Sequence, residues 1–438
     1  MATASTITPY AEVRNDLWRP LSGASPRYLT VLAGLSAIVL WGAFAWIYQL
    51  RQGIGVAGIR RPVFWGFYLV DFVFWIGISH AGTLISAILR LTDAGWRKPV
   101  TRAAEAITVF ALMIGGMFPI IHLGRAWLFY WLFPYPNSRL LWPNFRSPLV
   151  WDVTAISTYL TGSAIYLFLP LIPDVAQLAT HATGWRRRMY RALSLGWTGS
   201  DREWNALEHA MKLMACIILG VAVSVHTVVA WDFSMSVAPM WHSTIFGPYF
   251  VVGAIFSGIA ALLIAMAVIR RVMHLEKYLT PHHFNNLSKL LLLMSLLWLY
   301  FTISENLTAW YGNEPKEMNV FGAQLRGSFA PYFWTMVCCN FVVPFILLGI
   351  KKLRTIKTAI IASVTVLIGM WLERFLIIIL TLSFGRLSAT WGNYSPTWVE
   401  ISITVATFAA MVALYLVFAK LFPIVSVWEF EPHSEIAE

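Results

Sequence analysis

Ten long apolar segments dominate this 438-residue chain. They cover approximately residues 28–49, 62–89, 103–132, 149–172, 207–230, 247–269, 286–306, 330–350, 356–384 and 398–421. Each is long enough to cross a hydrocarbon core of about 30 Å as an α-helix, because an α-helix satisfies its backbone hydrogen bonds internally. The sequence therefore predicts an all-α polytopic membrane protein with about ten transmembrane helices within 28–422, and tails at 1–27 and 423–438.

The charge distribution predicts the orientation of these helices. Only 12% of the residues are charged, against about 25% in soluble domains. The net charge of +11 would suggest nucleic-acid binding in a soluble protein, but here most Lys and Arg residues lie in the loops of one side. Such loops stay in the cytoplasm. We expect both termini to be cytoplasmic, the loops rich in Pro and Trp to lie outside, and the chain to bind membrane lipid but no nucleic acid.

One stretch, residues 118–152, carries unusual charges beside a stiff loop. It reads FPIIHLGRAWLFYWLFPYPNSRLLWPNFRSPLVWD and places His122, Arg125 and Asp152 near the outer membrane surface. Ionisable groups are costly at that depth and mark functional sites. Pro119 removes one helical hydrogen bond, so we expect a kink beside Gly115 that opens room next to His122. The loop contains four prolines: Pro134, Pro136, Pro143 and Pro148.

Counting helical residues from the predicted outer surface brings further ionisable residues to the same leaflet. They are Asp232 at the end of the fifth segment, His226 about two turns deeper, Asp71 and Glu305. Simpler interpretations remain open for several of these residues. Asp232 and Glu305 are acceptable at a helix end, Arg125 can reach the lipid headgroups, and His226 can form a hydrogen bond across helices. His122 and Asp152 can also form a purely structural pair.

This set of residues fits the chemistry of quinol oxidation. A quinol releases two protons and two electrons, so it needs two proton acceptors. A histidine titrates in the required range, and a carboxylate can take the second proton. Aromatic and leucine side chains would hold the ring and its isoprenoid tail. We predict His122 and Asp152 as catalytic residues, with Arg125, Asp232 and His226 as further quinol-binding residues.

Other polar residues are candidates for proton transfer. His80 and Glu105 lie toward the cytoplasmic side, and with Asp71 and Glu305 they could carry protons. Asp71 and His80 cannot share a helix face, because nine residues separate them. Cys216, Cys338 and Cys339 form no CxxC motif, so we expect neither an iron–sulfur cluster nor c-type haem in this chain. A single b-type haem between His122 and His226 is the alternative. No zinc or other metal motif is present.

Five motifs resemble the NrfD/polysulfide-reductase family of membrane subunits, and within it the ActC-type subunits of bacterial alternative complex III. They are GISHAGTLISAILR at 77–90, RAAEAITVFA at 102–111, FPIIHLGR at 118–125, PYPN at 134–137 and WPNFRSPLVWDV at 142–153. The resemblance implies two four-helix bundles, at 62–230 and 247–384, with the first and last helices outside them. The quinol site would lie in the first bundle.

The resemblance also implies a function and partners. The chain would be the quinol-oxidising subunit of a respiratory complex in the bacterial cytoplasmic membrane, although the isolated chain need not be an enzyme. It would oxidise quinol, expected to be menaquinol, near the periplasmic face. Electrons would pass to a peripheral iron–sulfur subunit and then to multihaem cytochrome c subunits. A homologous NrfD-like membrane subunit and a terminal oxidase are further expected partners, and proton translocation has been proposed for the family.

Three other functions remain open at this point. The chain could be a structural anchor, or it could reduce quinone as a subunit of another respiratory oxidoreductase. A transporter built from inverted repeats is a third alternative, but we find no matching pair of helices broken by Gly or Pro.

Overall fold

The computed structural model describes residues 10–133 and 147–430, and in this part of the chain the regular elements are all helices. Ten of these helices, counting continuous helical segments, are long and apolar enough to cross a membrane. The predicted class, an all-α polytopic membrane protein, is therefore confirmed.

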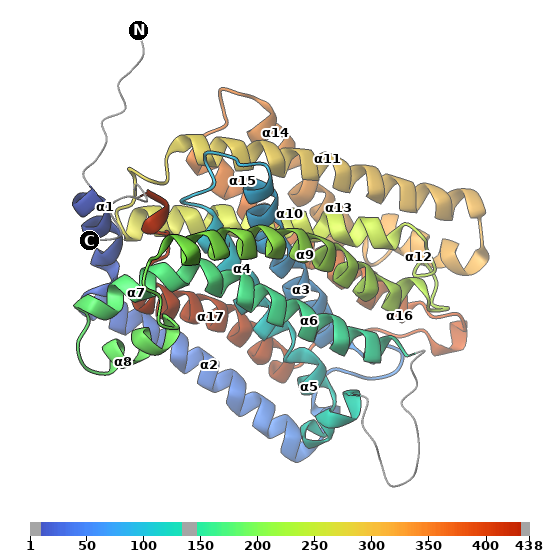
Figure 1. The fold of residues 1–438 in the computed structure, drawn as a ribbon. Helices are drawn as coiled ribbons and strands as arrows, with labels where there is room; N and C mark the ends of the chain where they lie inside the picture. Colours follow the sequence, from blue (N-terminus) through green and yellow to red (C-terminus); the bar gives the residue numbers. More distant parts are fainter. Residues whose placement is uncertain (1–9, 134–146, 431–438) are drawn as a thin grey trace.

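Eight of the ten spans form two four-helix bundles (Figure 1). In the first bundle, α3 contacts α4 and α9, and α6 closes the ring by contacting the same two helices. In the second bundle, α10 and α14 (Val343–Gly349) each contact α11 and α15 (Ile356–Phe375). Helices α3 and α10 pack against each other and join the bundles. The first bundle consists of α3 (Gly66–Leu91), α4 (Thr101–Gly115), α6 (Pro148–Phe168) and α9 (Asp201–Ser234). The second begins with α10 (Phe246–Val272) and α11 (Pro281–Gly312).

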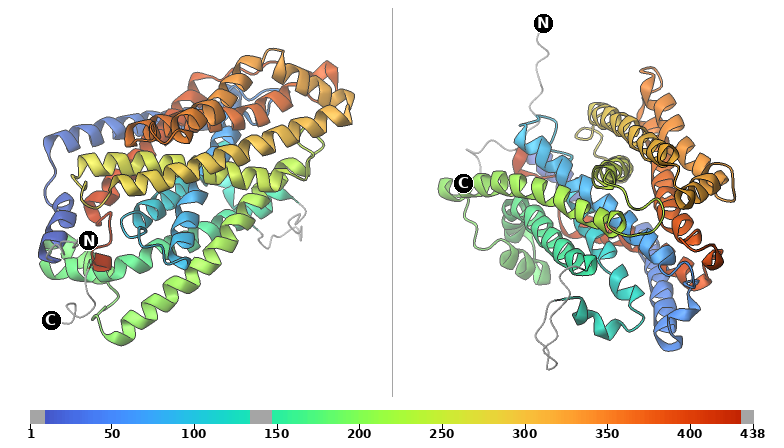
Figure 2. Two further views of the ribbon diagram at one scale, coloured as in Figure 1. Left: turned by 90° about the horizontal axis from the view of Figure 1, so that it is seen from above. Right: turned by 90° about the vertical axis from the view of Figure 1, so that its right-hand side faces the viewer.

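Two spans of the second bundle contain π-helical turns. One runs through α13 (Ala330–Val337), η5 (Cys338–Val342) and α14 (Val343–Gly349), and the other through α15 (Ile356–Phe375), η6 (Leu376–Leu380) and α16 (Thr381–Ser383). The remaining spans, α2 (Pro26–Gln52) and α17 (Trp398–Leu421), run side by side outside the bundles (Figure 2). Small residues permit such close contacts. A Cβ atom at Gly82 of α3 would lie 2.0 Å from the carbonyl oxygen of Ala104 in α4.

Short helices define the two ends of the molecule. We call the end with both described chain termini the basic end, on the left of Figure 1. It carries α1 (Tyr10–Trp18), η1 (Arg19–Leu21), η4 (Leu169–Leu171), α7 (Ile172–His181), α8 (Gly184–Leu193) and η8 (Trp428–Phe430). The opposite end, which we call the aromatic end, carries η2 (Ile54–Val56), α5 (Phe118–His122), η3 (Ala126–Leu132), α12 (Pro315–Leu325) and η7 (Ser388–Thr390).

The described parts of the terminal segments are folded onto the basic end. We expected tails at 1–27 and 423–438. Instead, α1 buries Val13 and Leu17, and Trp428 and Glu429 are also buried. Glu429 forms ion pairs with Arg90 at 3.4 Å and Arg97 at 2.6 Å, which explains why an acidic segment stays attached there. Residues 431–438 lie outside the described residues.

The third span is broken where the sequence predicts a kink. Helix α4 ends at Gly115, and α5 begins at Phe118 with Pro119 in its first turn. Because proline has no N–H group, it fits the first turn of a helix but interrupts a continuous one. The break separates the short helix that ends at His122 from the rest of the span.

Candidate functional site

A cavity of about 350 Å³ opens at the aromatic end of the first bundle. It lies where the start of α3, helix α5, the start of α6 and the end of α9 meet. Its size falls within the range of about 300–1,000 Å³ that is typical of ligand pockets. The lining contains His122, Asp152 and Asp232, and is otherwise almost entirely aromatic and aliphatic: Trp65, Tyr68, Leu69, Phe72, Phe118, Pro119, Leu123, Leu132, Ser147, Pro148, Phe233 and Trp241.

Backbone and ring contacts hold His122 in one orientation. Its Nε2 atom lies 3.1 Å from the carbonyl oxygen of Phe64, and its ring stacks on Trp65 with centroids 4.4 Å apart and planes at 16°. A carbonyl oxygen can only accept a hydrogen bond, so Nε2 carries the hydrogen. In the neutral ring the lone pair is therefore on Nδ1, which makes Nδ1 the basic atom.

Gln49 on α2 connects His122 to a second cavity residue. Its side-chain amide donates to the carbonyl oxygen of Ile121 at 3.1 Å, and its Oε1 atom accepts from the Tyr68 hydroxyl at 2.5 Å. Gln49 is fully buried. The side chain thus links three elements around the cavity, α2, α3 and α5. Neither Gln49 nor Tyr68 was predicted from the sequence, although a glutamine near the end of an apolar segment was a usable signal.

Two carboxyl groups face each other across the cavity wall. Asp152 lies in the first turns of α6 and Asp232 near the end of α9, and their side chains are within hydrogen-bonding contact. A hydrogen bond between two carboxyl groups requires a proton on one of them. Among the described residues, the Oδ1 atom of each has no hydrogen-bond partner. The pair can therefore hold one proton and still offer acceptor atoms.

A second group of contacts fixes the segment that carries Phe64 and Trp65. Glu400 on α17 accepts from the amide of Gly58 at 2.6 Å and from the Tyr394 hydroxyl at 2.5 Å. Tyr394 in turn accepts from the amide of Phe67 at 2.9 Å. Burial, and then the negative charge of Glu400, raise the pKa of Tyr394, so its hydroxyl remains a donor. The Thr397–Glu400 capping box was readable from the sequence, but the contact with Gly58 was not.

Two of the predicted quinol-binding residues do not line the cavity. Arg125 is exposed at the start of η3. His226 is buried against His80, with ring centroids 4.4 Å apart, and not against His122. The histidine pairing that we considered for a haem is therefore not the pairing that the structure contains. The predicted proline loop, including Pro134, Pro136 and Pro143, lies outside the described residues.

The remaining predicted polar residues are buried in separate places. Asp71 accepts from Trp371 at 2.9 Å and Thr404 at 2.5 Å, so it faces α15 and α17. Glu105 accepts from Ser86 at 2.5 Å in the first bundle, toward the basic end. His80, on the opposite face of α3 from Asp71, contacts the Tyr159 ring at 4.7 Å and has Nδ1 2.6 Å from the carbonyl oxygen of Ile76.

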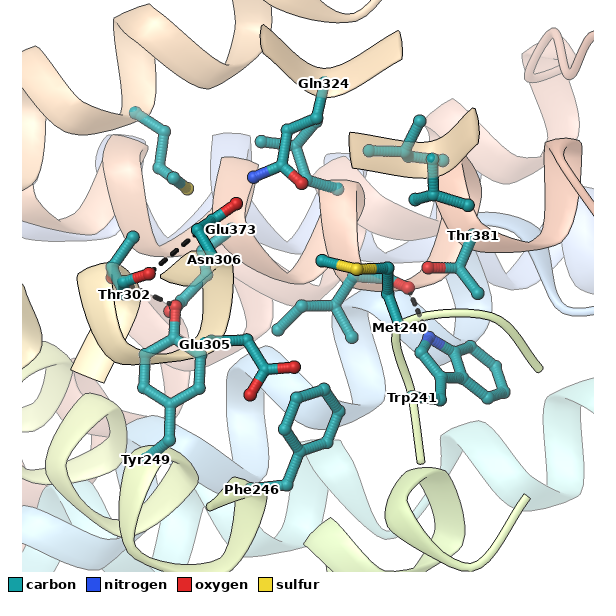
Figure 3. Close-up of a pocket in the computed structure, with 15 residues that line it drawn as sticks. Met240, Trp241, Phe246, Tyr249, Thr302, Glu305, Asn306, Gln324, Glu373 and Thr381 are labelled. Atoms are coloured by element: carbon teal, nitrogen blue, oxygen red, sulfur yellow. Dashed lines mark hydrogen bonds between the residues drawn. The ribbon is translucent and has the colours of Figure 1, made fainter. Parts of the chain in front are cut away.

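Glu305 lines a second, smaller cavity, of about 60 Å³, in the second bundle (Figure 3). Its Oε2 atom accepts from Ser243 at 2.7 Å. Glu373 also lines this cavity, accepts from the Trp298 indole at 2.8 Å, and forms an ion pair with Arg374 at 3.0 Å. The volume suits a few water molecules but not a quinol ring. Trp241 lines both cavities. In the described ranges, no group of three or more His, Cys, Asp or Glu residues could hold a metal ion.

Comparisons with known proteins place this architecture in a family. The family model for polysulphide reductase, NrfD, matches residues 55–384. Among similar proteins, one from Halobacterium salinarum, provisionally named as a membrane subunit of dimethyl sulfoxide reductase, is 26% identical over 77% of this chain and 73% of its own length. A selenate reductase subunit from Mesobacillus selenatarsenatis is 24% identical over 80% and 81%. The Hdr-like menaquinol oxidoreductase integral membrane subunit of Archaeoglobus fulgidus is 22% identical over 83% and 81%.

Proposed function

The chain belongs to the polysulphide reductase NrfD family of membrane subunits, and on that premise we propose that it oxidises quinol in the cavity at the aromatic end of its first bundle. The observation that carries this proposal is the joint placement of His122, Asp152 and Asp232 in one apolar cavity of suitable size. The name of the Archaeoglobus relative, a menaquinol oxidoreductase subunit, favours menaquinol as the substrate.

The geometry supplies two proton acceptors for the two quinol hydroxyl groups. His122 accepts one proton at Nδ1, because the Phe64 carbonyl holds the hydrogen on Nε2. The Asp152–Asp232 pair accepts the other proton at a free carboxylate oxygen. Two O–H bonds break, two electrons leave the ring, and the product is the quinone. The aromatic wall holds the ring and excludes bulk water.

The electrons leave to another subunit in this proposal. The sequence has no CxxC motif for a cluster of its own. We propose a peripheral iron–sulfur subunit at the aromatic end as the acceptor, followed by multihaem cytochrome c subunits. A homologous NrfD-like membrane subunit and a terminal oxidase complete the proposed alternative complex III type of assembly. The relatives, which are named as subunits of reductases or oxidoreductases, support a multi-subunit setting in general.

The proposed orientation places the basic end in the cytoplasm of a bacterial cell, with both termini there and the quinol site near the periplasmic face. The excess of Lys and Arg in the loops of the basic end supports it. Protons from quinol would then leave outward. We also propose His80, Glu105, Asp71 and Glu305 as residues for proton translocation. The burial of the first three residues in the protein and the place of the half-buried Glu305 in the lining of the smaller cavity support this proposal. Measurement of pH inside vesicles during turnover tests that extension.

Substitutions in the assembled complex test the proposal. We expect His122→Ala and Asp152→Asn each to lower quinol turnover by about 100-fold or more, since removing a general base costs about 10²–10⁴-fold. The same substitutions at exposed residues, His209→Ala and Asp93→Asn, serve as matched controls and should leave turnover unchanged. If turnover survived both cavity substitutions near the wild-type rate, the chain would be a structural anchor instead.

A further inference from the structure

A third cavity, of about 240 Å³, lies at the basic end, far from the proposed quinol site. It is formed where α2 begins and where α10 and α17 end, so it sits at the ends of three candidate membrane spans. At the ends of spans, a cavity meets lipid headgroups on one side and acyl chains on the other. The lining includes Arg19, Tyr28, Val272, Leu416 and Lys420.

Positively charged side chains are held at this cavity by neutral partners. The Lys420 ammonium donates to the carbonyl oxygens of Pro20 at 2.6 Å and Gly23 at 2.7 Å, and lies 5.1 Å from the centre of the Tyr28 ring. Arg19 donates to the carbonyl oxygen of Met273 at 2.8 Å. These bonds orient the two cations and leave other N–H groups of the Arg19 guanidinium for a ligand.

The charges at this cavity are uncompensated in the described part of the chain. No carboxylate lines the cavity, and neither Arg19 nor Lys420 forms an ion pair with a described residue. Some other cations at the basic end are neutralised, as Arg102 is by Asp174 at 2.5 Å. Carbonyl groups orient a cation but do not cancel its charge, so the cavity favours an anion. Arginine and lysine are the usual ligands of phosphate groups.

Apart from Ser25 and His274, the rest of the wall is largely apolar and continues along the membrane span. Val272 and Leu416 line the cavity, and Val272 is 65% exposed. Val268, one helical turn earlier on α10, is 52% exposed. An apolar strip therefore leads from the cations toward the middle of the span. A free phosphate ion would match only the cations, whereas an amphiphile with an anionic head would match both parts.

We propose that this cavity binds an anionic phospholipid of the leaflet that faces the basic end, with its phosphate on Arg19 and Lys420 and an acyl chain along Val272 and Val268. Basic pockets between transmembrane helices bind such headgroups. The lipid would join the end of α10 to the neighbouring ends of α2 and α17, which pack side by side. This inference does not depend on the quinol chemistry.

Lipid binding to the complete complex tests the proposal. The complex is delipidated in mild detergent and placed in nanodiscs of phosphatidylethanolamine with or without cardiolipin, and bound lipid is counted by native mass spectrometry. The variant Arg19→Gln/Lys420→Gln should bind cardiolipin about 30-fold more weakly, because each cation near a lipid headgroup contributes about 1 kcal/mol. Lys351→Gln/Lys352→Gln removes the same charge from exposed positions outside the cavity and should bind normally. Lys420→Arg keeps the positive charge and should retain most of the wild-type affinity for cardiolipin.

Three outcomes would overturn the proposal. The double variant could retain cardiolipin as the wild type does, or wild-type protein could retain phosphatidylethanolamine equally well. Displacement of cardiolipin by inorganic phosphate at comparable concentrations would instead identify a site for a free anion. Thermal unfolding of each variant in lipid-free detergent distinguishes weaker lipid binding from misfolding.

Discussion

Gln49 offers a test of how the proposed quinol site is held together, because its side-chain amide bonds to the cavity residue Tyr68 and to the backbone of Ile121, which precedes His122. Replacement by leucine keeps a similar volume but removes the bonds to Ile121 and Tyr68. Hydrogen bonds between membrane helices contribute about 0.6 kcal/mol each on average and at most about 1.7. We therefore expect Gln49→Leu to destabilise the chain by roughly 1–3 kcal/mol.

The effect on turnover should follow from the loss of position at His122. If the transition state loses the same free energy as the folded chain, up to about 3 kcal/mol, kcat/KM for quinol falls by up to about 100-fold. Each factor of ten in kcat/KM corresponds to about 1.4 kcal/mol. Gln49→Glu retains an acceptor for Tyr68 but replaces the amide donor to Ile121. Its kcat/KM should therefore lie between those of the wild type and Gln49→Leu. The assays are quinol:acceptor kinetics of the complex and thermal unfolding.

Ser295→Ala is the matched control, because Ser295 donates a buried hydrogen bond at 2.6 Å to the carbonyl oxygen of Asn340 in the second bundle. It should lower stability by about 0.6–1.7 kcal/mol, the contribution of one such bond, and leave kcat/KM unchanged. The reasoning is refuted if Gln49→Leu is destabilised and yet turns over quinol normally, or if Ser295→Ala slows turnover as much as Gln49→Leu does.

Three further predictions concern neighbouring contacts. Tyr394→Phe removes the hydroxyl between Glu400 and the amide of Phe67, and should raise KM for quinol. The free energy of unfolding, measured by thermal unfolding, should fall by about 1 kcal/mol. Trp65→Leu removes the ring stacked on His122, so steady-state kinetics should show a lower kcat. The subunit stoichiometry of the purified complex should stay that of the wild type. Asp174→Asn leaves Arg102 buried without its ionic partner, and should cost about 3–5 kcal/mol in stability while KM for quinol in the folded fraction stays constant.

Depth along the helices was predictable from the sequence, because apolar segments of known length fix how far each residue lies from the membrane surface. That is why Asp152 and Asp232, 80 positions apart in the sequence, could be assigned to one end of the first bundle. The break at Pro119 followed from its missing N–H group. The two-bundle arrangement came from the family resemblance, since composition and spacing do not specify which helices pack together.

Rotation about the helix axis is what depth counting omits. His226 lies six residues before Asp232, which is about one and two-thirds turns, so the two side chains point to different sides of α9. The same argument correctly separated Asp71 from His80, but we did not apply it to His226. Gln49 and Glu400 were missed for another reason. They belong to α2 and α17, and their contacts with the first bundle depend on packing between segments that are far apart in the sequence.

The most direct measurement of the central claim is a structure of the assembled complex with a bound, slowly reacting menaquinol analogue. We predict the ring in the cavity at the aromatic end, with one oxygen in hydrogen-bonding distance of His122 Nδ1 and the other of the Asp152–Asp232 pair. A ring bound elsewhere while this cavity stays free of it, at saturating analogue, would contradict the account.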